Sequence, residues 1–332
     1  MTGPADAVPA DAAVPAAPGI PVALSTGSVY TYGTARAFEL AARAGYDGVE
    51  VIVDDRWDTR QAAYLRRLTA GTGVPVLSVH SPFGAVSAWP RDEVERVQRS
   101  LELAEAVGAR TLNVHLPFRV HDLSVTAGVR RLFSLPVLPV SENHRRYRRW
   151  LTEGGLAAAQ AGTAVTIAVE NLPVRRVFGR RFNPYALNTW EALTAFPRVC
   201  LDTTHCGTTG ADLLAVYERL AERIVHVHLS DFTGRYQHQP LGRGTLPLAP
   251  FLERLRARGY GGIVVVELTP WALPVQDEGR LARELRRNLG FCREHLAAAA
   301  APPPAPLPSY GAAAPAFAGP PDPDRRADQP SG

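Results

Sequence analysis

The chain has 332 residues, of which 46% are hydrophobic and 20% charged, and its formal net charge is +4 at pH 7. This composition is typical of a globular protein with a hydrophobic core, and no apolar run approaches the roughly 18–20 residues of a membrane-spanning helix. The sequence contains no lysine, so every basic side chain is arginine or histidine. Schiff-base catalysis, a pyridoxal–lysine linkage and a P-loop lysine are therefore excluded.

The two ends of the chain differ in composition from its middle. Residues 1–19 are rich in Ala, Pro and Asp, and residues 298–332 in Ala and Pro, without the hydrophobic periodicity of a packed element. We expect two disordered tails around one folded domain at residues 20–297. The first residues have neither a basic start nor an apolar segment, so no signal peptide is predicted. Three cysteines are too few for a disulfide framework, and we expect a cytoplasmic protein without a membrane anchor.

Between these ends, short runs rich in Val, Ile and Leu alternate with helical patterns. Eight runs are typical of strands buried on both faces of a parallel sheet. They are residues 21–25, 48–53, 74–80, 110–115, 164–170, 198–202, 224–229 and 262–268. Helical patterns lie between them, for example at 34–45, 92–109 and 248–259, and several end in glycine, as helices commonly do.

Eight strand–helix units in about 275 residues predict an α/β fold, a closed (β/α)₈ TIM barrel. An open, doubly wound sheet is the alternative, although no G-x-G-x-x-G sequence follows the first strand. The segment from Phe118 to Tyr147 is long for a strand–helix connection. A long loop at this end of a barrel is either a substrate lid or a surface insertion, and both interpretations stay open.

Histidines and carboxylates occur at the ends of six consecutive predicted strands, the third to the eighth. They are His80, His115, Glu170, Asp202 with His205 three residues beyond it, His228 and Glu267. In a parallel barrel these ends meet on one face, where active sites are built. Histidine combined with carboxylate suits Zn²⁺, Mn²⁺, Co²⁺ or Fe²⁺ better than Ca²⁺, and a cation offsets the cost of burying the carboxylates. The sequence therefore predicts a metal site at the mouth of the barrel.

Three nearby residues have less specific interpretations. His226 shares the inward face with His228 but lies one layer deeper, so we expect it to support the site or belong to the core. Glu50, on the second predicted strand, either orients a ligand or forms a salt bridge. Cys206 shows no feature of an activated thiolate.

Several motifs together resemble the xylose isomerase-like TIM-barrel superfamily over residues 20–296. They are GYDGVEV, SVHSPF, NVHLP, AVEN, CLDTTH, HVHLSD and VVVEL. That superfamily includes sugar phosphate isomerases and epimerases, and also apurinic (AP) endonucleases of the endonuclease IV type.

In the isomerase and epimerase branch, the resemblance implies one divalent metal ion (Mn, Co, Mg or Zn) on four ligands. These are Glu170, Asp202, His228 and Glu267. It also implies that the two glutamates move protons on a sugar or sugar phosphate, through a metal-stabilised enediolate. The residues that would then bind the substrate are His205, Arg235, His80 and His115.

The endonuclease IV branch implies a different activity, a zinc phosphodiesterase acting on abasic DNA. The sequence is similar to that branch at four histidines, which would be additional ligands for a total of two or three zinc ions. They are His80, His115, His205 and His238. Tyr236 stands where that branch has an aspartate ligand.

The charge pattern adds little support for nucleic acid. The arginine-rich stretches 144–149 and 175–181 have three interpretations: a DNA-binding face, a phosphate-binding edge of the pocket, or solvated surface, which such stretches more often are. A net charge of +4 favours a small-molecule partner over nucleic acid without excluding the latter. Nothing in the sequence indicates the oligomeric state.

Overall fold

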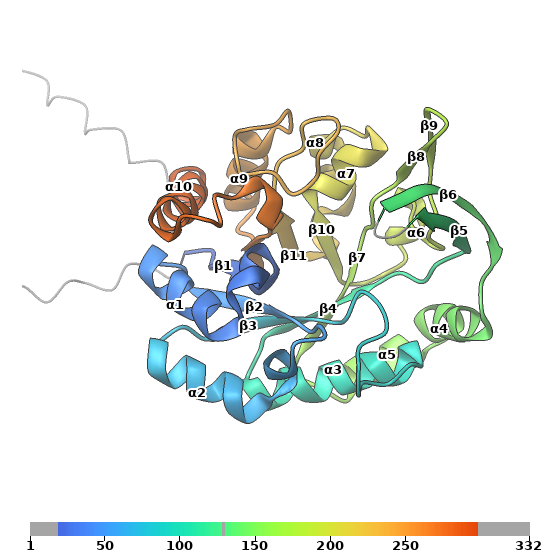
Figure 1. Ribbon diagram of the computed structural model, residues 1–332, viewed down its shortest axis with the longest axis horizontal. Helices are drawn as coiled ribbons and strands as arrows, with labels where there is room; N and C mark the ends of the chain where they lie inside the picture. Colours follow the sequence, from blue (N-terminus) through green and yellow to red (C-terminus); the bar gives the residue numbers. More distant parts are fainter. Residues whose placement is uncertain (1–18, 128–129, 298–332) are drawn as a thin grey trace, which may run out of the picture. The chain divides into compact units, whose positions relative to one another are not determined.

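Eight parallel strands form a closed barrel in the computed structural model, which describes residues 19–127 and 130–297 (Figure 1). The strands are β1 (Val22–Ser25), β2 (Gly48–Ile52), β3 (Val76–His80), β4 (Thr111–His115), β7 (Thr166–Glu170), β10 (Val199–Asp202), β11 (Ile224–Leu229) and β12 (Ile263–Val266). Their order around the barrel is β1-β12-β11-β10-β7-β4-β3-β2. The predicted barrel is confirmed, and the open sheet is wrong, because Ala23 of β1 pairs with both Gly48 and Val265.

The helices surround the strands (Figure 1). They are α1 (Thr34–Ala44), α2 (Ala62–Thr72), α3 (Glu93–Val107), α4 (Glu142–Thr152), α5 (Gly155–Ala161), α6 (Trp190–Leu193), α7 (Thr203–Thr209), α8 (Leu213–Leu220), α9 (Leu248–Ala257) and α10 (Glu278–Leu296). Short 3₁₀ turns are η1 (Thr26–Tyr32), η2 (Trp57–Arg60), η3 (Ala221–Arg223) and η4 (Pro270–Ala272). Within the described residues, none of the helices has the length and apolar character that crossing a membrane requires.

Local sequence signals fix the ends of the helices. Asp92 caps α3, because its Oδ1 accepts hydrogen bonds from the backbone N–H groups of Val94 and Glu95. Gly108 ends the same helix in the left-handed conformation, with φ of 75°. Leu281, Leu285 and Leu289 of α10 are four residues apart and buried, which is the spacing of a helix that packs on a core with one face.

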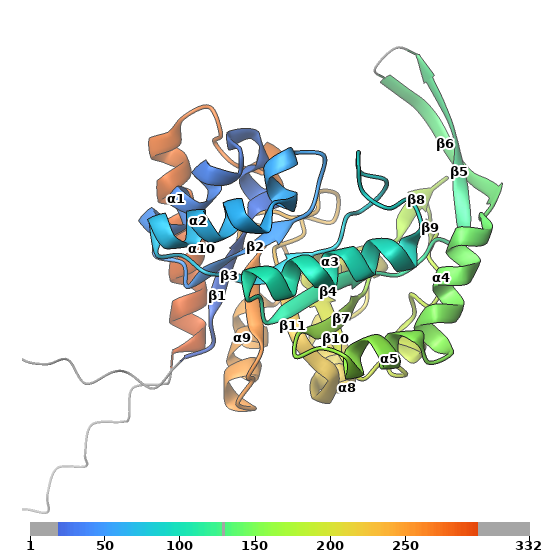
Figure 2. The ribbon, with the colours of Figure 1, turned by 90° about the horizontal axis from the view of Figure 1, so that it is seen from below.

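The segment from Phe118 to Tyr147 is not a loop. It forms the antiparallel strands β5 (Val120–Ala127) and β6 (Arg130–Pro139) and then leads into α4 (Figure 2). Prolines at 136 and 139 argue against a strand in a sequence pattern. They fit here because, among residues 19–127 and 130–297, β5 and β6 pair only with each other, so that each has an edge without a neighbouring strand. The segment is therefore a hairpin where an irregular loop was expected, and the lid and the surface insertion both stay predictions. A second short hairpin, β8 (Arg175–Val177) with β9 (Arg180–Phe182), follows β7.

The two expected tails fall outside the described residues, apart from Gly19. The three cysteines lie within the described residues, and all are buried and form no disulfide. The structure therefore contains no disulfide among residues 19–127 and 130–297, as the low cysteine count led us to expect.

Candidate active site

Four side chains at the carboxyl ends of the barrel strands converge on one point. Glu170, Asp202, His228 and Glu267 each offer a ligand atom, and these atoms all lie within 4.8 Å of one another. Nδ1 of His228 lies 3.0 Å from Oε2 of Glu267, 3.3 Å from Oε1 of Glu170 and 3.9 Å from Oδ2 of Asp202. None of the four is more than 7% exposed. One imidazole nitrogen therefore faces three buried carboxylates.

Strand register brings these residues together. Asp202 of β10 pairs with His228 of β11, and His115 of β4 pairs with Glu170 of β7. Because neighbouring strands lie about 4.8 Å apart, paired residues on the inward face have side chains in contact. The side chains from four separate parts of the chain thus meet at one mouth.

Asp202 has two roles, one for each carboxylate oxygen. Its Oδ1 accepts the backbone N–H of His205 at 2.8 Å and so caps α7. The side chain of Asn171 holds the backbone of Asp202 in place, accepting its N–H at 2.8 Å and donating to its C=O at 3.1 Å. Oδ2 of Asp202 is buried without a hydrogen-bond partner and faces the cluster. A buried carboxylate oxygen in this state suits a cation.

Glu50 is the support that fixes His228. This fully buried carboxylate is hydrogen-bonded through Oε2 to Nε2 of His228 at 3.3 Å, and its Oε1 lies 3.1 Å from the same nitrogen. Oε2 also accepts Oγ–H of Ser78 at 2.9 Å. Oε2 also lies 3.0 Å from Nε2 of His226. With Nε2 of His228 donating to Glu50, Nδ1 is left for the three carboxylates. Of the two interpretations of Glu50, orientation of a ligand is the one that this geometry favours.

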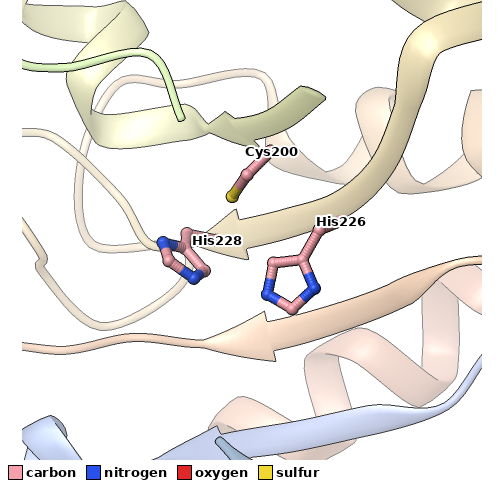
Figure 3. A group of neighbouring side chains, drawn as sticks. All are labelled: Cys200, His226 and His228. Carbon is pink, nitrogen blue, oxygen red and sulfur yellow. The ribbon is translucent and has the colours of Figure 1, made fainter. Parts of the chain in front are cut away.

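His226 and Cys200 lie one layer below the four converging side chains. Figure 3 shows Cys200 of β10 beside His226 and His228 of β11, and the ligand atoms of the three lie within 4.8 Å of one another. Burial raises the pKa of the Cys200 thiol, which keeps it protonated. Cys200 and His226 are fully buried, and His226 pairs with Glu50. Both residues therefore belong to the barrel interior, which agrees with the expectation for His226.

The electrostatics of the cluster are those of a site that needs positive charge. Burial raises the pKa of Glu267, but the charge and hydrogen bond of His228 outweigh it and lower that pKa to about 2. Burial also raises the pKa of Glu170, but the charge of His228 and the hydrogen bonds from the surrounding histidines outweigh it and hold that pKa well below its usual value. Burial lowers the pKa of His228, but the surrounding carboxylates outweigh it and raise that pKa well above its usual value. A divalent cation would supply the charge that a proton on His228 supplies otherwise, so the donor set fits such an ion.

Glu170 also belongs to a second group, on the β3 and β4 side. Its Oε2 lies 3.2 Å from Nε2 of His80 and 3.3 Å from Nε2 of His115, and accepts Nδ2–H of Asn113 at 2.5 Å. Nδ1 of His80 lies 2.7 Å from the C=O of Ser81. The structure therefore places both predicted histidines against Glu170.

A third group forms around α7 and the loop after β11. Asp202, His205 and His238 offer ligand atoms within 4.8 Å of one another. Burial lowers the pKa of His205, but Asp202 and Glu170 outweigh it and raise that pKa to about 9. His238 has φ of 50°, an uncommon conformation for a residue other than glycine. Tyr236 is 57% exposed and supplies no carboxylate to this group.

The arginines predicted near the site have other surroundings. The Arg235 side chain is exposed, outside the buried cluster, and its guanidinium lies 5.3 Å from the centre of the Tyr236 ring. In the stretch 144–149, Arg145 and Arg149 pair with Glu142, and Arg146 pairs with Asp92. Such exposed ion pairs are typical of a solvated helix surface, the third of its three interpretations.

Three polar residues that support the site were not predicted from the sequence, namely Ser78, Asn113 and Asn171. Ser78 and Asn113 each stand two residues before a histidine at a strand end, His80 and His115. Side chains two apart in a strand share a face, so this alternation was the available signal. Asn171 follows the strand and had no such signal.

Residues 38–288 match the family model described as xylose isomerase-like TIM barrel. The chain is 33% identical over 302 residues to an uncharacterized protein of Mycobacterium tuberculosis, covering 84% of this chain and 99% of that protein. It is 24% identical over 257 residues to L-ribulose-5-phosphate 3-epimerase UlaE of Escherichia coli, covering 72% of this chain and 82% of that protein.

Two solved structures share the fold at lower identity. 3-Keto-D-glucoside 4-epimerase YcjR of Escherichia coli has a TM-score of 0.60 at 19% identity, with 83% of this chain and 99% of that chain covered. A family 2 AP endonuclease of Brucella melitensis has a TM-score of 0.55 at 20% identity, with 76% and 93% covered. Together with the family model, which spans most of the barrel, these likenesses confirm the resemblance drawn from the motifs. The chain belongs to the xylose isomerase-like TIM-barrel family.

Proposed function

We propose that the protein is a divalent-metal-dependent isomerase or epimerase of sugars or sugar phosphates. The observation that carries this proposal is the convergence of three buried carboxylates on Nδ1 of His228 at the barrel mouth. The names of the relative UlaE and the structural neighbour YcjR, both sugar epimerases, support it. The three free, buried cysteines agree with a cytoplasmic enzyme.

The metal would be held by Glu170, Asp202, His228 and Glu267, with Mn²⁺, Co²⁺, Mg²⁺ or Zn²⁺ as the candidates. When bound, such an ion polarises a substrate carbonyl and the neighbouring hydroxyl, which acidifies the C–H bond next to the carbonyl.

Glu170 and Glu267 are the residues proposed to move the proton. They come from β7 and from the end of β12, which are not neighbours in the barrel, so they flank the centre of the mouth. Both pKa values are lowered, so both carboxylates are ionised near neutral pH. One ionised carboxylate takes the proton from carbon and becomes a carboxylic acid. In an isomerisation the same acid would return this proton at the neighbouring carbon. In an epimerisation the opposite glutamate would deliver, at the other face, a proton that it takes from solvent. His205, His80 and His115 would orient the substrate oxygens, with Arg235 at the exposed edge.

The alternative is an endonuclease IV-like zinc phosphodiesterase acting on abasic DNA. One observation favours it: His80 and His115 gather on Glu170, and His205 and His238 on Asp202, where two further metal ions would bind in such an enzyme. The absence of a carboxylate at Tyr236 and the ion-paired arginines of α4 weigh against it. We therefore rank it second.

Solvent deuterium uptake tests the proposal. Protein loaded with Mn²⁺ in D₂O is expected to incorporate deuterium next to the carbonyl of a ketose or ketose phosphate, detected by NMR or mass spectrometry. Nicking of an abasic duplex by zinc-loaded protein, with no deuterium uptake into any ketose or ketose phosphate tested, would contradict the proposal and favour the alternative.

The role of Glu50 gives a second test at the same site. Glu50→Gln removes the negative acceptor of His228 Nε2, so we expect metal affinity to fall by about 10–100-fold, the usual effect of losing such a partner. Competition with a chelating dye measures it. Ser78→Ala is the matched control, because it removes one donor to Glu50 and keeps the acceptor of His228. Equal metal affinities in Glu50→Gln and the unaltered protein would show that Glu50 serves only the fold.

A further inference from the structure

Exposed aromatic side chains gather on the face that carries the site. Among the described residues, the large hydrophobic side chains that are exposed are Tyr30, Trp57, Phe83, Phe178, Tyr236 and Trp271. Each of them follows the carboxyl end of a barrel strand. Exposed apolar surface that is restricted to one face of a protein marks a binding surface. The loops around the barrel mouth therefore expose apolar side chains that could contact a part of the ligand lying outside the buried cluster.

Two of these side chains line a cavity beside the site. The cavity has a volume of about 530 Å³, and Tyr236 and Trp271 form part of its wall, with Trp271 84% exposed. The other wall residues are Arg235, Gln237, His238, Gln239, Thr269 and Ala272. Its size is within the roughly 300–1,000 Å³ of small-molecule sites.

His238 lines the cavity and also belongs to the candidate metal site. Its Nδ1 lies 4.0 Å from Oε2 of Glu267, and it belongs to the group with Asp202 and His205. The backbone N–H of Thr269 donates to the C=O of His238 at 2.8 Å, which joins the loops after β11 and β12. A ligand in the cavity would therefore lie directly next to a substrate held at Glu267.

The opposite side of the mouth is much narrower. The strands β3 and β4 lie across the barrel from β11 and β12. The cavity there, next to His115 and Phe83, has a volume of about 110 Å³. A reacting sugar thus has room for a small end group on the His115 side and for a further ring on the Trp271 side.

The chemistry of the larger cavity fits a sugar ring. Indole and phenol faces pack against the C–H groups of a pyranose, and glutamine and arginine side chains bond to its hydroxyls. A phosphate fits less well, because the wall supplies one guanidinium, that of Arg235, and its remaining polar groups, apart from His238, are neutral. We propose that this cavity is a subsite for a second sugar ring, so that the substrate is a glycoside of the reacting sugar. This inference rests on the proposed function and specifies its substrate class.

Deuterium uptake with paired substrates tests it. The probes are lactulose and isomaltulose, which carry a second ring on a ketose, against fructose and fructose 6-phosphate, all with Mn²⁺-loaded protein in D₂O. We expect kcat/KM to be at least tenfold higher for one of the disaccharides than for either single-ring sugar. Trp271→Ala is expected to raise the KM for that disaccharide and to lower the ratio of disaccharide to fructose efficiency about tenfold. Because Trp271 is 84% exposed, the variant is expected to fold.

Trp57→Ala is the control, since Trp57 is an exposed aromatic of the same face that does not line the cavity, and the ratio should not change. A higher efficiency for fructose or fructose 6-phosphate than for both disaccharides would overturn the subsite and leave the proposed function standing. A ratio unaffected by Trp271→Ala would also overturn it. Absence of exchange with every sugar would overturn the proposed function, and this inference with it.

Discussion

The rate of proton exchange is expected to fall by about 10²–10⁴-fold when Glu170 is replaced by glutamine, the usual range for loss of a general base. Glu170 lies at the centre of the site, because four histidines surround its carboxylate. His228 and His205 lie 3.3 Å from Oε1, and His80 and His115 lie 3.2 and 3.3 Å from Oε2. Glutamine has the same shape and one remaining oxygen but is not a base. Because Glu170 is also a proposed metal ligand, exchange is measured at a metal concentration that saturates the variant, so that the remaining loss reports proton transfer.

The fold should survive this substitution. A buried amide in place of a carboxylate leaves one or two hydrogen bonds unmade, at about 1–3 kcal/mol each. That cost is smaller than the stability of a typical domain, about 5–15 kcal/mol. Deuterium uptake measures the exchange, and circular dichroism with a thermal melt measures the fold.

Glu95→Gln is the control for this experiment, because Glu95 is exposed on α3 and away from the site. Its exchange rate should equal that of the unaltered protein. Exchange by a folded Glu170→Gln variant at the unaltered rate would remove Glu170 from the role of proton carrier.

Removal of the metal is expected to abolish activity and to lower the melting temperature by about 8–16 °C. An ion present at about 1,000 times its dissociation constant stabilises the folded state by about 4 kcal/mol. In a domain of this size, each kcal/mol corresponds to about 2–4 °C. The physical reason is that the three buried carboxylates around His228 repel one another when no cation balances them.

Differential scanning calorimetry before and after dialysis against a chelator measures this shift, and re-addition of Mn²⁺, Co²⁺, Mg²⁺ or Zn²⁺ in turn identifies the ion that restores both properties. An identical melting temperature with and without chelator, together with full activity after dialysis, would contradict a structural and catalytic role for a metal.

The barrel and the converging residues were predictable for the same reason. Apolar strands buried on both faces, separated by capped helices, leave few folds open, and in a closed parallel barrel the carboxyl ends of all strands lie at one mouth. His80, Glu170 and Asp202 are the final residues of their strands, so their convergence followed from the fold.

Other features depended on information that no single segment carries. The role of Glu50 depends on register, because a shift between Val49 and Glu50 aligns Glu50 with Ser78 of β3 and places both under His228. The hairpin of β5 and β6 contradicted a local rule, since its prolines are tolerated only because the two strands have no other neighbours. Arg235 was expected at the substrate from the resemblance to epimerases, and this stays a prediction, with the side chain exposed beside Tyr236.

The metal content of the protein tests most directly whether Glu170, Asp202, His228 and Glu267 share an ion. Mass spectrometric metal analysis, with Mn²⁺ titration followed by electron paramagnetic resonance, should give one tightly bound ion per chain. Asp202→Asn, which alters the unpartnered oxygen facing His228, should weaken that binding at least about tenfold. Binding of equal strength and stoichiometry in Asp202→Asn and the unaltered protein, or no bound ion in either, would contradict the account.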